Sequence, residues 1–337
     1  MSDRVLVTGI SGFLGGHLAL ALLKSGYTVR GSVRNLDRAA AVRETLAAAG
    51  GDVTRLEFVA LDLLSDSGWD EAMSGVRYLQ HTASPFVLET PKDPQELIRP
   101  AVEGTRRALG AALRTNVEHI VLTSSIAAIQ YGHKSYERLL TEADWTRQDA
   151  PSTGAYPASK TLAERMAWQM VESAGRRNTL SVINPAGIFG PLLDSDPGTS
   201  SLLVRRLLDG RLPAVPRLYM ACVDVRDVVA LHVAAMTDPA FFGQRCIAAE
   251  GVYAMSEVGA MLRPAFPNRR VPTATLPNWI VRLAALFDRD IRDNMHEIGT
   301  PKRLDTTRAP RLLGRPLIGT PKAVIATGRS LVEHGLV

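Results

Sequence analysis

The chain has 337 residues, of which 46% are hydrophobic and 22% charged, and its formal net charge is +5. A chain of this length and composition forms a large globular core, here expected as one main domain with a smaller appendage. Its basic residues are dispersed, and the densest stretch, residues 263–270, is interrupted by apolar residues and prolines, so no nucleic-acid partner is expected. No apolar run approaches the ~20 residues that span a bilayer, so no membrane partner is expected.

The cysteines and histidines carry no metal-site pattern. Cys222 and Cys246 lack ligand spacing and are expected to be reduced, buried thiols. The seven histidines are scattered, with no pair at zinc-site spacing, so no metal is expected. No signal peptide precedes the first predicted strand. A cytoplasmic protein is therefore predicted.

The first 190 residues alternate between β-branched runs and helical patterns. Strands are predicted at residues 4–8, 27–33, 56–61, 78–82, 119–123 and 179–184, and helices at residues 13–25, 39–49, 67–73, 95–113 and 158–173. Strands that alternate with helices form a parallel sheet covered on both faces. The predicted fold class is therefore α/β, with a Rossmann-type doubly wound parallel sheet over residues 1–190.

The sequence pattern changes after Pro191, where prolines become frequent and strand and helix patterns no longer alternate strictly. Residues 191–337 are predicted to form mainly a smaller substrate-binding lobe. Two segments in the range 219–248, residues 219–225 and 244–248, are predicted to return to the main sheet as late strands. The two lobes are therefore expected to be interleaved.

Three glycines, Gly9, Gly12 and Gly15, lie between the first strand and the first helix. Glycine allows a tight turn and lets a pyrophosphate approach the helix N-terminus, where backbone N–H groups and the helix dipole favour an anion. In this strand-to-helix context the motif predicts a dinucleotide cradle. A turn that binds no ligand is the alternative.

The end of the second strand distinguishes NAD from NADP. An NAD site usually carries Asp or Glu there, whereas the 2′-phosphate of NADP calls for a cation. Here Arg34 follows the strand, and Arg38 lies one helical turn further on as a second candidate clamp. The predicted cofactor is therefore NADP(H). Asp62 and Leu63, after the third strand, are candidates to contact adenine, with an ordinary turn aspartate as the alternative.

Tyr156 and Lys160 lie one helical turn apart, near the start of the helix predicted at residues 158–173. Reduction of a carbonyl needs a proton donor at the developing oxyanion. Tyrosine, with an ordinary pKa of about 10, serves in this role when a nearby cation stabilises its phenolate. Lys160 supplies that cation on the same helix face. Upstream, the fifth strand ends in Ser124 and Ser125, and chemistry alone does not decide which of them faces a substrate.

These motifs resemble those of the extended short-chain dehydrogenases/reductases. Within them, the chain is similar to the branch of dihydroflavonol reductase, cinnamoyl-CoA reductase and yeast methylglyoxal (aldehyde) reductase. The likeness covers nearly the whole chain and is strongest over residues 1–191; the matching stretches are residues 7–15, 26–30, 81–85, 93–94, 100–105, 123–125, 156–164, 185, 190–191 and 223–228. Residues 152–155 lack the Trp-Cys signature of the cinnamoyl-CoA enzymes, which argues against a CoA thioester substrate.

The resemblance implies roles for individual residues. Ser125 would hydrogen-bond the substrate carbonyl, Tyr156 would protonate it, and Lys160 would lower the pKa of the phenol and hold the nicotinamide ribose. The implied cofactor contacts are Gly9, Gly12, Phe13 and Leu14 at the pyrophosphate, Arg34 at the 2′-phosphate, Asp62 and Leu63 at adenine, Thr82, Ala83 and Ser84 along the backbone on the nicotinamide side, and Pro185 and Ile188 along the carboxamide.

Apolar residues beside these motifs are candidates for a substrate pocket, although each could instead belong to the core. They are Phe86, Val87, Ile126, Tyr131, Phe189, Leu192 and Leu193. The predicted function is an NADPH-dependent carbonyl reductase that acts reversibly on a small-molecule ketone or aldehyde with a hydrophobic or aromatic body. A nucleotide-sugar epimerase or dehydratase and a non-catalytic NADP-sensing protein are the alternatives. A monomer and a homodimer both stay open.

Overall fold

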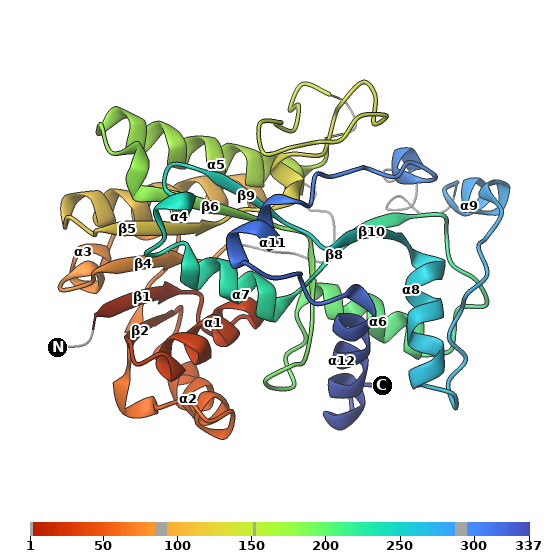
Figure 1. Cartoon of the computed structure of the whole chain (residues 1–337), viewed down its shortest axis with the longest axis horizontal. Helices are drawn as coiled ribbons and strands as arrows, with labels where there is room; N and C mark the ends of the chain where they lie inside the picture. Colours follow the sequence, from red (N-terminus) through yellow and green to blue (C-terminus); the bar gives the residue numbers. More distant parts are fainter. Residues whose placement is uncertain (1–2, 85–92, 151–152, 287–294) are drawn as a thin grey trace.

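A seven-stranded parallel sheet forms the centre of the computed structural model, which describes residues 3–84, 93–150, 153–286 and 295–337 (Figure 1). Every neighbouring pair of strands in it runs parallel. In spatial order the strands are β3 (Leu56–Ala60), β2 (Thr28–Val33), β1 (Arg4–Thr8), β4 (Tyr78–His81), β5 (His119–Thr123), β6 (Leu180–Pro185) and β9 (Arg245–Ala248). The predicted doubly wound α/β fold is confirmed.

Helices cover both faces of this sheet (Figure 1). One apolar core contains side chains of α1 (Phe13–Lys24), α2 (Ala39–Ala48), α7 (Val225–Ala234) and α11 (Arg308–Leu313). A second core contains side chains of α3 (Trp69–Met73), α4 (Gln95–Arg114) and α5 (Ala155–Ser173). Strand β1 divides its side chains between them, since Val5 and Val7 enter the first core and Leu6 the second. Burial on both faces explains the continuous apolar runs of β1 and β5, residues 5–7 and 120–122.

The smaller lobe has a sheet and a core of its own. Its strands lie in the order β10 (Gly251–Ala254), β8 (Tyr219–Asp224) and β7 (Gly187–Phe189), with β8 antiparallel to β10 and parallel to β7. Helices α6 (Thr199–Leu208), α8 (Met255–Leu262) and α12 (Thr320–Glu333) pack in its apolar core, and α9 (Asn278–Ala284) follows α8 in the chain.

The two late segments lie in different sheets. Residues 244–248 join the main sheet, where β9 pairs with β6. The prediction that residues 219–225 also join it is wrong, because β9 already occupies the outer side of β6 and β8 pairs instead with β7 and β10. The chain beyond Pro191 nevertheless supplies both lobes, since α7, β9 and α11 pack in the main core.

The cysteines are buried free thiols, Cys222 in the smaller lobe and Cys246 in the main core. Burial raises the pKa of each thiol to about 12. Among the described residues, no group of three or more His, Cys, Asp or Glu side chains gathers as metal ligands would. No helix in the described ranges is both long and apolar enough to cross a bilayer.

The order of strands reverses between β1 and β4, the point where sheets of this kind bind ligands beyond the carboxyl ends of their strands. Thr8, at the end of β1, ties the two strand ends together. Its hydroxyl accepts hydrogen bonds from the backbone N–H groups of Thr82 and Ala83, each 3.1 Å away, and its carbonyl accepts one of 2.6 Å from the Thr82 hydroxyl. The loops that follow β1 and β4 are therefore fixed against each other.

Three of the buried imidazoles make the fold especially sensitive to acid. His81 lies 2.8 Å from the Thr8 hydroxyl, His119 lies 2.8 Å from the Ser181 hydroxyl, and His232 lies 2.8 Å from the side-chain oxygen of Gln80. Burial lowers the pKa of His81 and of His232 to about 3 and that of His119 to about 4. All three are neutral at pH 7. Their stabilisation is complete above the ordinary pKa of 6.5 and is lost as the pH falls toward 3, because the unfolded chain takes up protons first.

We expect each buried imidazole to reduce the free energy of unfolding by about 2 kcal/mol between pH 7 and pH 5. His232→Gln removes one titrating group, so the difference in the free energy of unfolding between pH 7 and pH 5 should become smaller by about 2 kcal/mol. The exposed His334, changed to Gln, is the matched control and should leave it unaltered. Guanidinium unfolding at the two pH values measures both, and an unchanged pH dependence in His232→Gln would contradict the assignment.

Candidate active site

The chain turns so tightly from β1 into α1 that positions 9 and 15 accept only glycine. Gly9 has a φ of +70°, and a Cβ on it would lie 3.0 Å from the Cα of Ala83. A Cβ on Gly15 would lie 2.2 Å from the carbonyl oxygen of Gly9. Gly12 caps α1 without a side-chain hydrogen bond, and the first helical turn holds no acidic residue. This helix N-terminus therefore fits a pyrophosphate.

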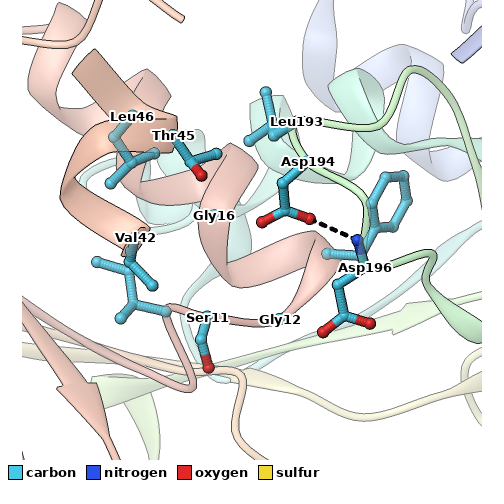
Figure 2. Close-up of a pocket in the computed structure, with 11 residues that line it drawn as sticks. Ser11, Gly12, Gly16, Val42, Thr45, Leu46, Leu193, Asp194 and Asp196 are labelled. Atoms are coloured by element: carbon cyan, nitrogen blue, oxygen red, sulfur yellow. Dashed lines mark hydrogen bonds between the residues drawn. The ribbon is translucent and has the colours of Figure 1, made fainter. Parts of the chain in front are cut away.

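Residues 191–198 cross the outer side of this turn, where Figure 2 shows a small cavity between α1, α2 and the crossing segment. Leu193 packs there, 3.4 Å from where a Cβ on Gly16 would lie. The carboxylate of Asp194 accepts a 2.9 Å hydrogen bond from the backbone N–H of Asp196, and both carboxylates line the cavity (Figure 2). Ser11, Gly12 and Phe13 of the glycine turn line the same cavity, and the two carboxylates make its outer side unfavourable for a phosphate.

Two arginines follow β2. The N–H of Gly9 donates to the Ser32 hydroxyl at 3.3 Å, which places the end of β2 beside the glycine turn. Arg34 is exposed and makes no hydrogen bond or ion pair with the rest of the described chain. Arg38 lies 3.7 Å from the carboxylate of Asp196, with both side chains more than half exposed. Arg34 is thus available to bind a phosphate, whereas Arg38 already faces an anion.

Both residues predicted to contact adenine, Asp62 and Leu63, interact with other parts of the protein. Asp62 accepts a 2.8 Å hydrogen bond from the backbone N–H of Leu64, which is the turn role that the sequence left open. Leu63 is half-buried and lies against α4 at Gly104, where a Cβ would come within 2.6 Å of it. Contact between this pair and adenine stays a prediction.

Ser125, Tyr156 and Lys160 converge where β5 ends and α5 begins. The Ser125 hydroxyl accepts a 3.1 Å hydrogen bond from the N–H of Ala127 and shares another with the Tyr156 hydroxyl. The Lys160 ammonium lies 6.0 Å from the centre of the Tyr156 ring. Ser124 points elsewhere, because its hydroxyl donates to Glu164 at 2.6 Å. The structure thus selects Ser125 as the serine beside the tyrosine.

The protonation states suit a proton donor beside a cation. Burial raises the pKa of the Tyr156 phenol, an effect that its hydrogen bond with Ser125 partly offsets. Burial lowers the pKa of Lys160 to about 8, against the opposing influence of the Glu164 carboxylate. At pH 7, Tyr156 therefore carries its proton and most of the Lys160 population is charged.

Two of the residues predicted for a substrate pocket lie near this centre, and two others belong to the core. Ile126 directly follows Ser125, and the ring of Tyr131 lies in the same loop, 4.5 Å from the Lys302 ammonium. Phe189 is 0% exposed and packs in the core of the smaller lobe, so the pocket prediction for it is wrong. Strand β7 pairs with β8 and turns Phe189 toward that core. Leu192 in that core and Ile126 in the main core are each 7% exposed, and contact of either with a substrate stays a prediction. Phe86 and Val87 lie outside the described residues.

The remaining predicted cofactor contacts lie around the same edge of the sheet. Phe13 and Leu14 are the first two residues of α1, and both are half-buried. Thr82, Ala83 and Ser84 directly follow β4. Pro185 ends β6, the strand next to β5, and Ile188 is half-buried in β7.

Sequence reasoning gave no role to several polar residues of the site. Glu164 had a detectable signal, because it continues the four-residue spacing of Tyr156 and Lys160 on α5. No sequence pattern indicated Arg245 or Lys302, because each reaches the site from a distant part of the chain. Only the folded chain reveals them.

The chain matches the model of the NAD dependent epimerase/dehydratase family over residues 5–245. It belongs to this family. It is 32% identical over 336 residues to cinnamoyl-CoA reductase 1 of Arabidopsis thaliana, covering 98% of this chain and 90% of that protein. It is 34% identical over 272 residues to tetraketide alpha-pyrone reductase 2 of the same plant, covering 79% and 84%.

Among solved structures, yeast methylglyoxal/isovaleraldehyde reductase Gre2, complexed with NADPH, superimposes with a TM-score of 0.82 at 25% identity. The match covers 99% of this chain and 100% of that one. The predicted resemblance to this branch of extended short-chain dehydrogenases/reductases is confirmed. The family description names a nicotinamide dinucleotide, in agreement with the glycine turn.

Neighbouring glycines offer a matched test of the cradle. We expect Gly15→Ala to weaken dinucleotide binding more than about tenfold, because the new Cβ would displace the Gly9 carbonyl and widen the turn. Gly16→Ala should bind within about twofold of the unchanged protein, since its Cβ would meet only a side chain at 3.4 Å and a backbone oxygen at 3.6 Å. Fluorescence titration with NADPH and NADH measures both variants, and equal losses would contradict the role of the turn.

Proposed function

We propose that this protein is an NADPH-dependent carbonyl reductase, which converts a ketone or an aldehyde reversibly into an alcohol. The observation that carries the proposal is the hydrogen bond between Ser125 and Tyr156, with Lys160 beside the same tyrosine ring. This group lies at the sheet edge that also carries the glycine turn. Relatives of at least 30% identity that are named as reductases support the same reaction class.

The residues around the turn fit NADP(H). Gly9, Gly12 and the start of α1 would hold the pyrophosphate, and Arg34 would hold the 2′-phosphate. The NADPH in the Gre2 complex supports the choice of cofactor. When bound, NADPH supplies the hydride that is added to the carbonyl carbon.

The side chains supply the proton. The Ser125 hydroxyl holds the carbonyl oxygen, and the Tyr156 phenol donates its proton as negative charge develops there. Lys160 stabilises the resulting phenolate, which solvent then reprotonates. Because burial raises the pKa of Tyr156, the donor is ready at neutral pH, which favours reduction. Oxidation of the alcohol needs the phenolate and should require a higher pH.

The residues beside the catalytic group favour an apolar substrate. Ile126 and Tyr131 follow Ser125 in one loop, and they would face a hydrophobic or aromatic body attached to the carbonyl. A CoA thioester is not proposed, because residues 152–155 lack the signature of the enzymes that use one. The proposed partner is therefore a small-molecule ketone or aldehyde.

A nucleotide-sugar epimerase or dehydratase is the second candidate, because the family description includes both activities. The structure of a UDP-glucuronic acid 4-epimerase from Bacillus cereus superimposes with a TM-score of 0.74, but at 18% identity this likeness shows the fold alone. Calorimetric titration with UDP-sugars separates the two functions, and tight binding would favour the epimerase. A sensor without chemistry is less well supported, since Tyr156 and Lys160 are both present.

We expect the protein to oxidise NADPH when mixed with aromatic, aliphatic or dicarbonyl substrates, with the highest rates for bulky ketones or aldehydes. Tyr156→Phe should lower kcat by about 100-fold or more and leave NADPH affinity within about twofold, because only the proton donor is lost. Absorbance of the reduced nicotinamide and fluorescence titration give the two values. A variant that keeps most of its rate would refute the role of Tyr156.

Arg34→Ala should raise KM for NADPH about tenfold and leave KM for NADH nearly unchanged, because only NADPH carries the 2′-phosphate. Arg38→Ala is the control, and it should have a smaller effect because Asp196 already lies next to that guanidinium. Steady-state kinetics with both cofactors measure the selectivity. An equal rise in KM for NADPH and for NADH would show that Arg34 does not bind the 2′-phosphate.

A further inference from the structure

A buried carboxylate with an unusual number of partners lies behind the catalytic residues. Glu164 is fully buried, one helical turn beyond Lys160 on α5. Arg245, whose side chain is 8% exposed, donates to both carboxylate oxygens at 2.5 and 3.2 Å. The Ser124 hydroxyl at 2.6 Å, the Asn184 amide at 2.8 Å and the Trp168 indole at 3.3 Å donate to the same carboxylate. Buried ion pairs add little stability compared with apolar packing, so a network with this many donors to one carboxylate indicates another role.

One arm of the network reaches Ser125. The Asn184 amide donates to the Ser125 backbone carbonyl at 3.2 Å as well as to Glu164. Ser124, which donates to Glu164, is the preceding residue in the chain. The carboxylate therefore fixes the strand end from which the Ser125 hydroxyl reaches Tyr156.

A second arm runs through Arg245 to the loop after β5. The guanidinium donates to the backbone carbonyls of Glu142 and Asp144 at 2.7 and 2.6 Å and lies 3.8 Å from the centre of the Trp145 ring. The hydroxyl of the next residue, Thr146, donates to the carbonyl of Ala127 at 2.7 Å and accepts from the N–H of Tyr131 at 3.0 Å. The same ion pair therefore anchors the loop that carries Ile126 and Tyr131.

The charges around Lys160 give Glu164 an electrostatic role. The ammonium is buried beside Tyr156 on its own helix and His81 on β4, and the latter is neutral because burial lowers its pKa to about 3. In the part of the chain that the structure describes, Glu164 is the anion that acts on Lys160, and Arg245 lies behind it. Without that anion, burial alone would disfavour the charged lysine.

We propose that Glu164 is a positioning residue for the Ser-Tyr-Lys group. Its negative charge keeps the buried Lys160 protonated, and its hydrogen bonds to Ser124 and Asn184 hold Ser125 against Tyr156. Arg245 completes the network and joins it to the loop after β5. The inference rests on the proposed reductase function, but its electrostatic part concerns this chain alone and can be measured without turnover.

Glu164→Gln and Ser124→Ala separate charge from hydrogen bonding. Glu164→Gln should lower the pKa of Lys160 below its value of about 8 in the unchanged protein. NMR titration of the lysine ammonium in the cofactor-free protein measures this pKa, and the Lys160→Arg variant assigns the signal. Glu164→Gln should also lower kcat about tenfold or more and move the alkaline limit of kcat/KM to lower pH. Ser124→Ala keeps the charge, so it should lower kcat without moving the pKa of Lys160.

A purely structural role would reduce the melting temperature of Glu164→Gln and leave both the pKa of Lys160 and the alkaline limit in place, which would overturn the proposal. If the single variant does not fold because Arg245 is left unpaired, Glu164→Gln/Arg245→Met removes both charges. That pair should still lower the pKa of Lys160, because Glu164 is the charge that acts on Lys160, and an unchanged pKa would again overturn the proposal. A lowered pKa in a protein that reduces no carbonyl would refute the proposed function and leave this electrostatic inference standing.

Discussion

The burial of the Glu164 carboxylate constrains the whole catalytic edge of the sheet. A charge removed from water needs hydrogen-bond donors on every side, and here they come from the end of β5, from β6, from β9 and from α5 itself. These strands are neighbours in the sheet, so their order and register must be correct before the carboxylate is satisfied. The Glu164 carboxylate therefore has all of these donors only when β5, β6, β9 and α5 are packed together.

The glycine turn after β1 depends on a second local constraint, at Thr8. This residue joins the loops after β1 and β4, and its hydroxyl also lies against the buried His81. The backbone of Ala83 is thereby held so close to Gly9 that a side chain at the glycine would collide with it. The glycine turn and the Ser125, Tyr156 and Lys160 group are thus built on the same sheet, which fixes the spacing between them.

The later part of the chain shapes the surroundings of this centre. Leu140 in the loop after β5 pairs with Leu304 through backbone hydrogen bonds to Arg303 and Asp305. That pairing brings the Lys302 ammonium over the Tyr131 ring. At the other end, Asp196 in the segment after Pro191 approaches Arg38. Residues outside the motifs that define the family therefore contact both Tyr131 and Arg38.

The sequence by itself determined the features that depend on near neighbours. The alternation of strands and helices, the glycine turn, the position of Arg34 after a strand and the one-turn spacing of Tyr156 and Lys160 all follow from rules that act over a few residues. Only the tertiary structure decided which serine faces Tyr156, that Phe189 and Leu192 belong to a core, and that β8 joins a second sheet. Arg245 reached Glu164 across 81 residues of sequence. Such contacts are set by strand order and packing, which local spacing does not encode.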